Sequence, residues 1–496
     1  MKTSRFEVLS TQEVERIHAA SMDLLATAGV HLDWPPAQDL FRQAGAQVDV
    51  AAQRVRIPER LVRWAVEEAP RRFTLYGSAV DFALEIGGAA PCFAGLGTPT
   101  HILDLETGQR RACTMADVVR HIQLINACQH IHNSQMDVWP DDIPMTTIHS
   151  QAIWEWAHHS RKPFGMGCYG YLPTLDMMRM MAIASGGKDA LRQRPTFFAI
   201  CSVGSPMQMI QAQLEGLLIC AEYGQPLAMS PEAIAGATAP VTLAGLLAQQ
   251  NASVLAHVVL AQIWHPGTPV LYGTVSTIAN MRLGTVALGA VETGLITAGA
   301  AQMARHYSLP CRSVGGTTES MREDVQAGLE RSGTLLPAVL AGVDFITCGG
   351  TLEGTMLESE AMLVLDDEWC GAAMRLARGV DVDDGTLAVD LIKEIAPRSG
   401  GNYLAEEHTV RHFRQEHFIP ALLPREPHDT WEKGGSRTAL DRAKERVRDI
   451  LANHRPRDLD PALEQELDDY RQMVAQRPMD EFYMHEMAEY QRWDDL

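Results

Sequence analysis

Residues 230 to 276 read SPEAIAGATAPVTLAGLLAQQNASVLAHVVLAQIWHPGTPVLYGTVS, and this stretch decides the fold. An apolar run at 226–229 ends in the polar Ser-Pro-Glu loop, and a second run at 269–272 ends in the polar Gly-Thr-Val-Ser loop. A long apolar helix separates the two runs and is broken at His265-Pro-Gly. Strands that each run into a polar loop, with a helix between them, are typical of the catalytic rim of a (β/α)8 barrel.

The same alternation of strand and helix continues from about residue 111 to residue 400. The candidate strands end near Asp137, Tyr169, Ser202, Met229, Tyr272, Arg312 and Thr347. Seven recognisable strands predict an α/β fold, a (β/α)8 TIM barrel in which one strand escapes detection. A dinucleotide-binding fold would need a GxGxxG turn that opens a helix, whereas Gly95-Leu-Gly97 opens a hairpin.

The chain divides into three parts on these patterns. Residues 1–110 are expected to form an N-terminal α/β extension that caps the barrel, and this part begins with a capping-box helix after Ser10. Residues 101–111, HILDLETGQRR, predict a hairpin with Glu-Thr-Gly at its tip. Residues 111–400 are expected to form the (β/α)8 barrel as the catalytic core. Residues 401–496 are expected to be a helical segment packed on the barrel, with the last twenty residues as an exposed tail or an oligomer contact.

Composition bounds the partners and the compartment. The 496 residues carry a net charge of −20, which disfavours binding to nucleic acid or to an anionic membrane surface. The nine cysteines form no CxxC pair and leave one unmatched, so a reducing compartment is indicated. The N-terminus has no apolar signal core, and no apolar run reaches 18 residues. We therefore expect a cytoplasmic protein.

The common catalytic motifs are missing from the sequence. The adjacent His158-His159 pair lies on a predicted helix, where neighbouring side chains diverge, and no HExxH or zinc-type Cys/His spacing occurs. Gly204-Ser205 is followed by proline and is not a nucleophile elbow. We therefore predict neither a metal site nor a catalytic triad, and we assign no catalytic residue.

Polar and aromatic residues gather instead at the predicted strand ends, where barrel enzymes place their functional groups. The ionisable residues there are Asp137, Glu232, Arg312, Glu319 and Glu353. Aromatic residues make up 6% of the chain, yet Trp139, Tyr169, Tyr171 and Tyr272 lie at or just past strand ends. Several aromatic faces around one rim could enclose a quaternary ammonium group through cation–π attraction.

The sequence resembles the trimethylamine methyltransferase family over nearly its whole length. The resemblance rests on the opening helix at 13–29, on ATAPVTLAG and GTPVLYG, and on LEGTMLESEAMLVLDDE at 352–368. It is most specific in GGNYLAEEHTVRHFRQEHFIPALLPREPHDTWEKGG at 400–435. The resemblance implies a (β/α)8 barrel that takes a methyl group from a methylated amine and passes it to cobalt(I) of a separate corrinoid protein.

One departure from the family narrows the expected substrate. The founding members carry pyrrolysine in the barrel, whereas this sequence uses only the standard twenty amino acids. It therefore resembles the non-pyrrolysine branch, whose members act on quaternary amines such as glycine betaine, carnitine and proline betaine. A quaternary ammonium leaves as a neutral amine, so its displacement needs neither a proton nor a Lewis acid. The missing triad and metal site agree with this chemistry.

The resemblance and the strand-end positions together suggest roles for eight residues. Trp139, Tyr169 and Tyr272 are expected to wall the trimethylammonium group, and Arg312 to hold a substrate carboxylate in a bidentate fork. The remaining four are expected to position the substrate or to orient Arg312, and they are Gln135, Glu232, Glu353 and Thr347.

Two alternatives stay open on the sequence alone. The methyl acceptor could be tetrahydrofolate instead of cobalamin on a corrinoid protein, and neither would be bound tightly by this chain. The protein could also be a non-catalytic betaine-binding protein, because fold and site do not guarantee turnover. We further expect a homo-oligomer.

Overall fold

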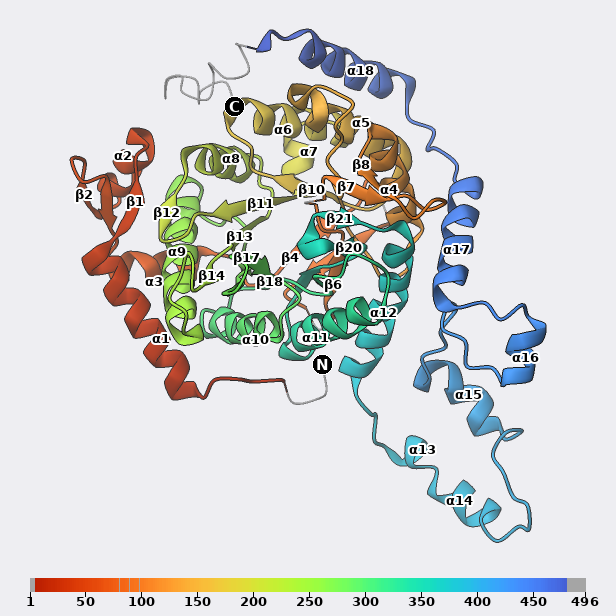
Figure 1. The fold of residues 1–496 in the computed structure, drawn as a ribbon. Coiled ribbons are helices and arrows are strands. Elements are labelled where there is room, and N and C mark those ends of the chain that lie inside the picture. The colour runs from red at the N-terminus through yellow and green to blue at the C-terminus, as the bar shows by residue number, and fades with distance from the viewer. Residues whose placement is uncertain (1–4, 80, 89, 98, 480–496) are drawn as a thin grey trace.

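The computed structural model describes residues 5–479 except 80, 89 and 98. At its centre is a parallel barrel of eight strands (Figure 1). The ring runs in the order β6, β19, β18, β15, β13, β11, β10, β9 and is closed by a parallel bridge between Ala94 and Asn133. The strands are β6 (Cys92–Ala94), β9 (Ser134–Gln135), β10 (Phe164–Gly167), β11 (Phe197–Val203), β13 (Leu227–Pro231), β15 (Val270–Thr274), β18 (Cys311–Val314) and β19 (Phe345–Thr347). The predicted (β/α)8 fold is confirmed.

The strand that the sequence did not reveal is β6, and it corrects one domain boundary. β6 pairs in parallel with β19, with Cys92 beside Phe345 and Ala94 beside Thr347. The barrel therefore begins near residue 92, inside the range 1–110 that was expected to be a separate extension. After β6 the chain forms the predicted hairpin at 101–111 before the first barrel helix at Met115–Ala127, so this strand stands outside the strand–helix alternation that was recognised.

A helix follows each barrel strand and covers its outer face. The eight helices are α4 (Met115–Ala127), α5 (Ile148–His159), α6 (Tyr171–Ser185), α8 (Gln211–Glu222), α9 (Leu243–Trp264), α10 (Val291–His306), α11 (Val325–Ala341) and α12 (Glu360–Arg378), and the short α7 (Lys188–Gln193) follows α6. Within the described residues, α9 alone is long and apolar enough to cross a membrane. It is instead buried in the protein, because the N-terminal helices α1 and α3 pack on its outer side. This burial explains why α9 is apolar all round.

The N-terminal part packs against the outside and the floor of the barrel. Its elements are α1 (Thr11–Asp23), α2 (Pro35–Gln43), α3 (Glu59–Glu68), β1 (Val30–Leu32), β2 (Gln47–Asp49), β3 (Arg54–Arg56), β4 (Phe73–Tyr76) and β5 (Ala83–Ile86), with a π-helical turn at Leu24–Ala28. The predicted capping box is present, since Ser10 and Glu13 bond reciprocally. The strands β1 to β3 form a sheet with β12 (Gln208–Met209). The β4–β5 hairpin adds Leu75 and Ile86 to the apolar cluster inside the barrel.

Two small sheets stand on the loops that follow the barrel strands. One contains β20 (Thr351–Leu352), β21 (Leu357–Glu358), β7 (His101–Leu103) and β8 (Arg110–Ala112), and β7–β8 is the predicted hairpin. The other contains β14 (Ile234–Ala235), β16 (Thr277–Asn280) and β17 (Thr285–Ala287). Short 3-10 turns occupy Met145–Thr147 and Glu353–Thr355. Both sheets therefore lie around the carboxyl ends of the barrel strands.

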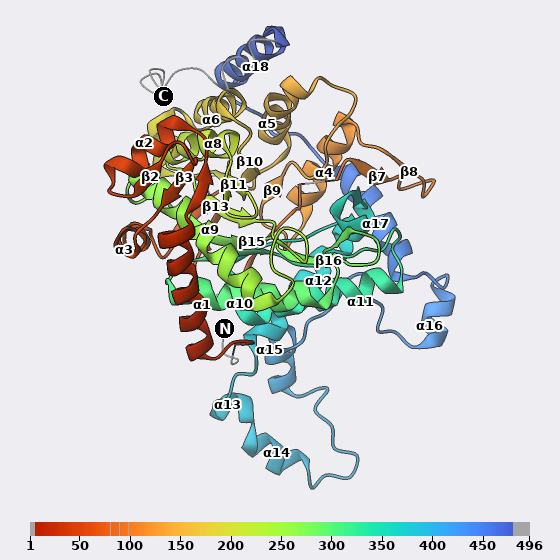
Figure 2. The same ribbon diagram turned by 60° about the vertical axis from the view of Figure 1, so that its left-hand side comes forward.

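The C-terminal part is helical. It contains α13 (Asp384–Leu387), α14 (Val389–Ile395), α15 (Glu407–Glu416), α16 (His428–Lys433), α17 (Ala439–Asn453) and α18 (Pro461–Gln476). Helix α17 packs on α12 and α4, and α18 packs on α5 and α6. Helices α13 and α14 project away from the barrel (Figures 1 and 2). The predicted tail at 480–496 lies outside the described residues.

Candidate active site

Side chains alternate between the inside and the outside of the barrel strands, and this alternation decides which residues reach the interior. Phe198 and Phe345 stack inside the barrel with their ring centroids 4.0 Å apart and fill its lower half. Nearer the carboxyl ends the inner positions are small, and Gly167 and Ser202 are half-buried. Solvent therefore reaches the inner wall from the carboxyl ends of the strands.

Arg312 of β18 is the most unusual residue on this inner wall. Its side chain is 1% exposed, and it donates one hydrogen bond of 2.8 Å to Thr347 Oγ1 and a long one of 3.4 Å to Ser230 Oγ. Its Nε has no partner, and no carboxylate pairs with it in the described part of the chain. Burial lowers the pKa of Arg312 to about 10. The barrel thus holds a positive charge whose direct hydrogen-bond partners are hydroxyl groups, and the charge of Glu232 also favours it without forming an ion pair.

Glu232 extends the inner face of β13 beyond Ser230. No hydrogen bond or ion pair to its carboxyl occurs among the residues that the structure describes. The side chain is accessible to solvent, yet burial raises its pKa, and the charge of Arg312 opposes this rise. Glu232 is therefore a solvent-accessible carboxyl that the surrounding protein still partly desolvates.

Two aromatic side chains lie beyond the ends of β9 and β10, and one of them, Tyr169, is close enough to Glu232 for the carboxylate to raise its pKa. Trp139 and Tyr169 meet edge to face, with centroids 5.4 Å apart and an interplanar angle of 86°. Trp139 Nε1 donates to the carbonyl of Gly97 at 3.3 Å, and both rings are half-buried. A Cβ on Gly167 would lie 2.6 Å from the Tyr169 ring, so the ring folds over the strand end only because residue 167 is glycine.

Gln135 of β9 also faces inward, because it is in register with Gly165 of β10. Its side chain is 2% exposed, and its Nε2 has no hydrogen-bond partner in the described structure. The structure thus gathers six of the eight predicted residues on the inner wall. This group is called the mouth site and consists of Gln135, Trp139, Tyr169, Glu232, Arg312 and Thr347.

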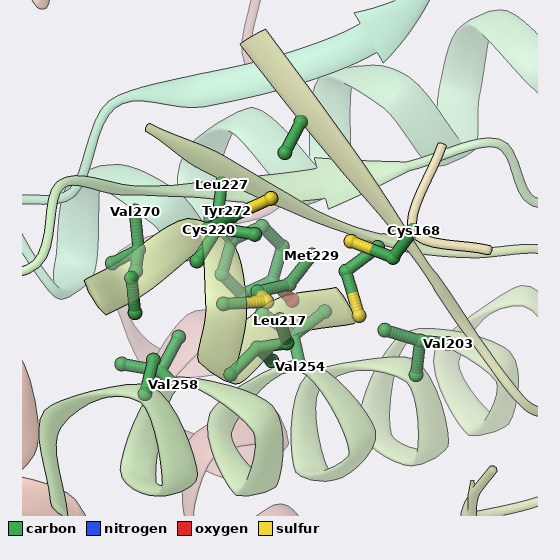
Figure 3. Packing of buried hydrophobic residues seen from close by; sticks show 14 of the residues in the cluster. Cys168, Val203, Leu217, Cys220, Leu227, Met229, Val254, Val258, Val270 and Tyr272 are labelled. Carbon is green, nitrogen blue, oxygen red and sulfur yellow. The ribbon is translucent and has the colours of Figure 1, made fainter. Parts of the chain in front are cut away.

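The prediction that Tyr272 walls the substrate is wrong. Tyr272 is in register with Met229 and Cys311 on the outer face of the barrel, and it is fully buried. Its ring stacks on Tyr307 at 6.4 Å, and Figure 3 shows it packed with Leu217 and Val254 between strand and helices. It is a core residue.

The prediction that Glu353 positions the substrate or orients Arg312 is also wrong. Glu353 lies in the short turn after β20, and both of its carboxylate oxygens accept from Arg110, at 2.8 and 3.3 Å. The carboxylate is therefore engaged by a half-exposed arginine of β8 and does not join the mouth site.

Three buried ionisable residues beside the barrel were not assigned a role from the sequence. All four carboxyl oxygens of Asp137 and Glu358, and both ring nitrogens of His121, have no hydrogen-bond partner among the described residues. Burial raises the pKa of both carboxyls well above the usual range, and Asp137 raises that of Glu358 further. Burial also lowers the pKa of His121, whose Nε2 lies 3.8 Å from Glu358 Oε1. Only the strand-end position of Asp137 pointed to this cluster.

Two glycines make room for these carboxyls. A Cβ on Gly95 would lie 1.6 Å from Asp137 Oδ1, and a Cβ on Gly350 would lie 1.5 Å from Glu358 Oε1. The Gly95-Leu-Gly97 segment is thus a close-packing turn against the end of β9.

A separate cavity of about 610 Å³ lies at the opposite end of the barrel. Arg5, Asp344, Arg414 and Phe418 are among its lining residues. Asp344 precedes β19, so this cavity is at the amino ends of the strands, where barrel enzymes do not place their chemistry. The mouth site is the better candidate for an active site.

The fold and the mouth site are those of a (β/α)8-barrel enzyme that acts on a small molecule, with charged and aromatic side chains on its inner wall at the carboxyl ends of the strands. Comparison with known sequences then identifies the family. Residues 1–478 match the trimethylamine methyltransferase (MTTB) family, and the chain belongs to it.

Two relatives show the extent of this similarity. Glycine betaine methyltransferase of Desulfitobacterium hafniense (strain Y51) is 34% identical over 476 residues, covering 95% of this chain and 97% of the relative. Trimethylamine methyltransferase MttB of Desulfitobacterium hafniense (strain DSM 10664 / DCB-2) is 31% identical over 452 residues, covering 91% and 90%.

A solved structure supports the fold alone. The crystal structure of the hydroxylamine MtmB complex superposes with a TM-score of 0.56 at 11% identity, covering 91% of this chain and 90% of that one.

Proposed function

We propose that the protein removes a methyl group from a carboxylated quaternary amine, glycine betaine or a close analogue, and passes it to the cobalt(I) of a corrinoid protein. The observation that carries this proposal is the buried guanidinium of Arg312, which forms no ion pair with a carboxylate among the described residues and has Glu232 as an electrostatic neighbour in common with Tyr169. A buried charge without a partner is costly, and a ligand carboxylate would compensate it.

Recognition of the two ends of the substrate follows from the positions of the side chains. Arg312 offers its charge to the carboxylate, held in place by the hydroxyl of Thr347. Trp139 and Tyr169 present an edge-to-face pair to the trimethylammonium group, which is attracted to aromatic faces. A betaine carries both groups, whereas choline lacks the carboxylate and trimethylamine lacks both the carboxylate and the permanent charge.

The methyl transfer needs little further chemistry from this chain. Cobalt(I) of the corrinoid would supply the nucleophile. The side chains hold the substrate so that one N–CH3 bond points out of the barrel, and they remove water from around the cation. Loss of water favours a step that converts a cation into a neutral amine.

The surroundings of the mouth site favour an acceptor that is carried by a protein. The loops that contain β14, β16 and β17 present Val241, Met281 and Leu283, which are 66%, 72% and 74% exposed. Exposed apolar groups around an active-site opening suit protein docking. Free tetrahydrofolate, the alternative acceptor, would not need them.

We also propose that the protein assembles as a homo-oligomer. The segment around α13, α14 and α15 leaves Val380, Leu404 and Val410 71%, 84% and 64% exposed. Large apolar side chains at this density are typical of surfaces covered by another chain. Light scattering coupled to gel filtration tests this, and a monomer at micromolar concentration would contradict it.

The function is tested by incubating the purified protein with glycine betaine and either free cob(I)alamin or tetrahydrofolate. We expect loss of cob(I)alamin absorbance together with dimethylglycine, detected by mass spectrometry, and no dimethylglycine with tetrahydrofolate. Arg312→Met is the control variant. Binding of glycine betaine without dimethylglycine from either acceptor would contradict the proposal and favour a non-catalytic betaine-binding protein.

A further inference from the structure

We infer that Glu232 is the acid that protonates the tertiary amine released when the quaternary amine loses its methyl group. This inference rests on the proposed function. When the C–N bond breaks, its electron pair stays on nitrogen and the methyl carbon bonds to the acceptor. The nitrogen lone pair then takes the proton of the Glu232 carboxyl, which becomes a carboxylate and regains a proton from solvent.

The position of Glu232 suits this role. The residue continues the inward-facing series of β13 after Ser230, which is in register with the inner-facing Ser202 of β11. The charged and titratable groups that face it are Arg312 of β18 and Tyr169 after β10. Its carboxyl makes no hydrogen bond or ion pair with any described residue, so its proton is free to move to a ligand.

The other carboxyls around the carboxyl ends of the strands are occupied or enclosed. Glu353 is bound by Arg110, and Glu319 accepts from the backbone N–H of Gly289 at 3.1 Å. Asp137 and Glu358 are 3% and 0% exposed and cannot exchange protons directly with solvent. Among these groups, Glu232 alone is both accessible and unengaged.

The protonation state agrees with the position. Burial raises the pKa of Glu232, so the acid form is more populated near neutral pH than for an exposed glutamate. An ionised carboxylate next to the aromatic pair would stabilise the substrate cation and so slow a step that destroys its charge. A neutral carboxyl avoids this stabilisation. Protonation of the product also removes the lone pair that would attack the methylated acceptor, so it opposes methyl return.

The reverse reaction, in which dimethylglycine is methylated again, allows the proton transfer by Glu232 to be measured separately. Dimethylglycine is an ammonium ion near neutral pH, so its remethylation by methylcobalamin first requires removal of a proton. By microscopic reversibility the carboxylate of Glu232 removes it. We expect the kcat/KM of the wild-type protein for this reaction to rise with pH through the pKa of Glu232, and that of Glu232→Gln to be about 100-fold lower without this rise.

Substrate binding provides the second measurement. Glutamine is a neutral isostere of the protonated acid, so the Kd of Glu232→Gln for glycine betaine should stay within about threefold of the wild-type value by calorimetry. Glu319→Gln is the matched control and should leave both the Kd and the reverse reaction unchanged. Glu319 also has a raised pKa but lies outside the mouth site.

The outcomes separate the two proposals. If Glu232→Gln binds glycine betaine more than tenfold more weakly, or returns methyl groups with the wild-type pH profile, Glu232 is not the acid and this inference is overturned. If the wild-type protein forms no dimethylglycine from glycine betaine, the proposed function itself fails.

Discussion

Replacing Arg312 by methionine should weaken the binding of glycine betaine while leaving the free protein at least as stable as before. Methionine fills much of the same volume without charge. Burial lowers the pKa of the guanidinium from 12.5 to about 10, which corresponds to about 3 kcal/mol of lost solvation of the charged form. The group is charged in both states at neutral pH, so the folded protein bears this cost there. The cost disappears only when the pH rises through the folded and then the unfolded pKa.

The uncompensated charge of the buried Arg312 guanidinium also sets the expected change in affinity for glycine betaine. A substrate carboxylate compensates the buried charge, and each charge-assisted hydrogen bond contributes about 1.5–3 kcal/mol. Losing roughly 3–4 kcal/mol raises the Kd for glycine betaine by about 10²–10³. Calorimetric titration measures the affinity, and urea unfolding measures the stability.

Arg331 provides the matched control. It is as deeply buried as Arg312, at 2% against 1% exposed, but it is paired with Asp366. Arg331→Met should therefore lose about 3–5 kcal/mol of unfolding free energy because the buried carboxylate of Asp366 loses its ion-pair partner, and the folded fraction should bind glycine betaine normally. The reasoning is refuted if Arg312→Met binds glycine betaine within threefold of the wild-type Kd. It is also refuted if Arg312→Met loses as much stability as Arg331→Met.

Three further changes probe the rest of the account. Trp139→Leu removes one aromatic face and should weaken glycine betaine binding about 5- to 30-fold, since a desolvated cation–π contact contributes about 1–2 kcal/mol; calorimetry giving an unchanged Kd would exclude Trp139 from the site. Tyr272→Phe should leave that Kd unchanged, because the ring lies outside the barrel, and a tenfold loss would show that we have misplaced it. Asp137→Asn with Glu358→Gln should stabilise the protein increasingly as the pH rises above the ordinary pKa of a carboxyl group. Both native carboxyls have pKa values raised by burial, so the wild-type protein loses stability as the pH rises from the unfolded-state pKa values towards these raised values, and a constant difference in urea unfolding would contradict this.

The barrel could be predicted because each of its longer strands is an apolar run that ends where polar residues or glycine begin. Val270–Thr274 of β15, for example, begins with the apolar run Val-Leu-Tyr and ends in Gly-Thr, where the polar segment at 273–276 begins. β6 gave no such signal because a hairpin and not a helix follows it, and it is fixed by pairing with β19, some 250 residues later, and by the bridge from Ala94 to Asn133. Short strands of this kind depend on tertiary contacts.

The candidate site was predicted less well than the fold, for a physical reason. Both faces of a barrel strand are buried, so the sequence does not alternate between apolar and polar residues and does not show which side chains face inward. Tyr272 and Arg312 both lie near strand ends, yet one faces the helices and the other the interior. The pairing of Glu353 with Arg110 joins residues 243 positions apart, and no local pattern reports it.

Calorimetric titration of the wild-type protein with glycine betaine, choline and trimethylamine tests the central claim most directly. The account predicts that glycine betaine binds at least about 100-fold more tightly than choline, because choline has no carboxylate for Arg312, and that trimethylamine binds more weakly still. Equal affinities for choline and glycine betaine would contradict it, because the buried charge of Arg312 would then contribute nothing to recognition.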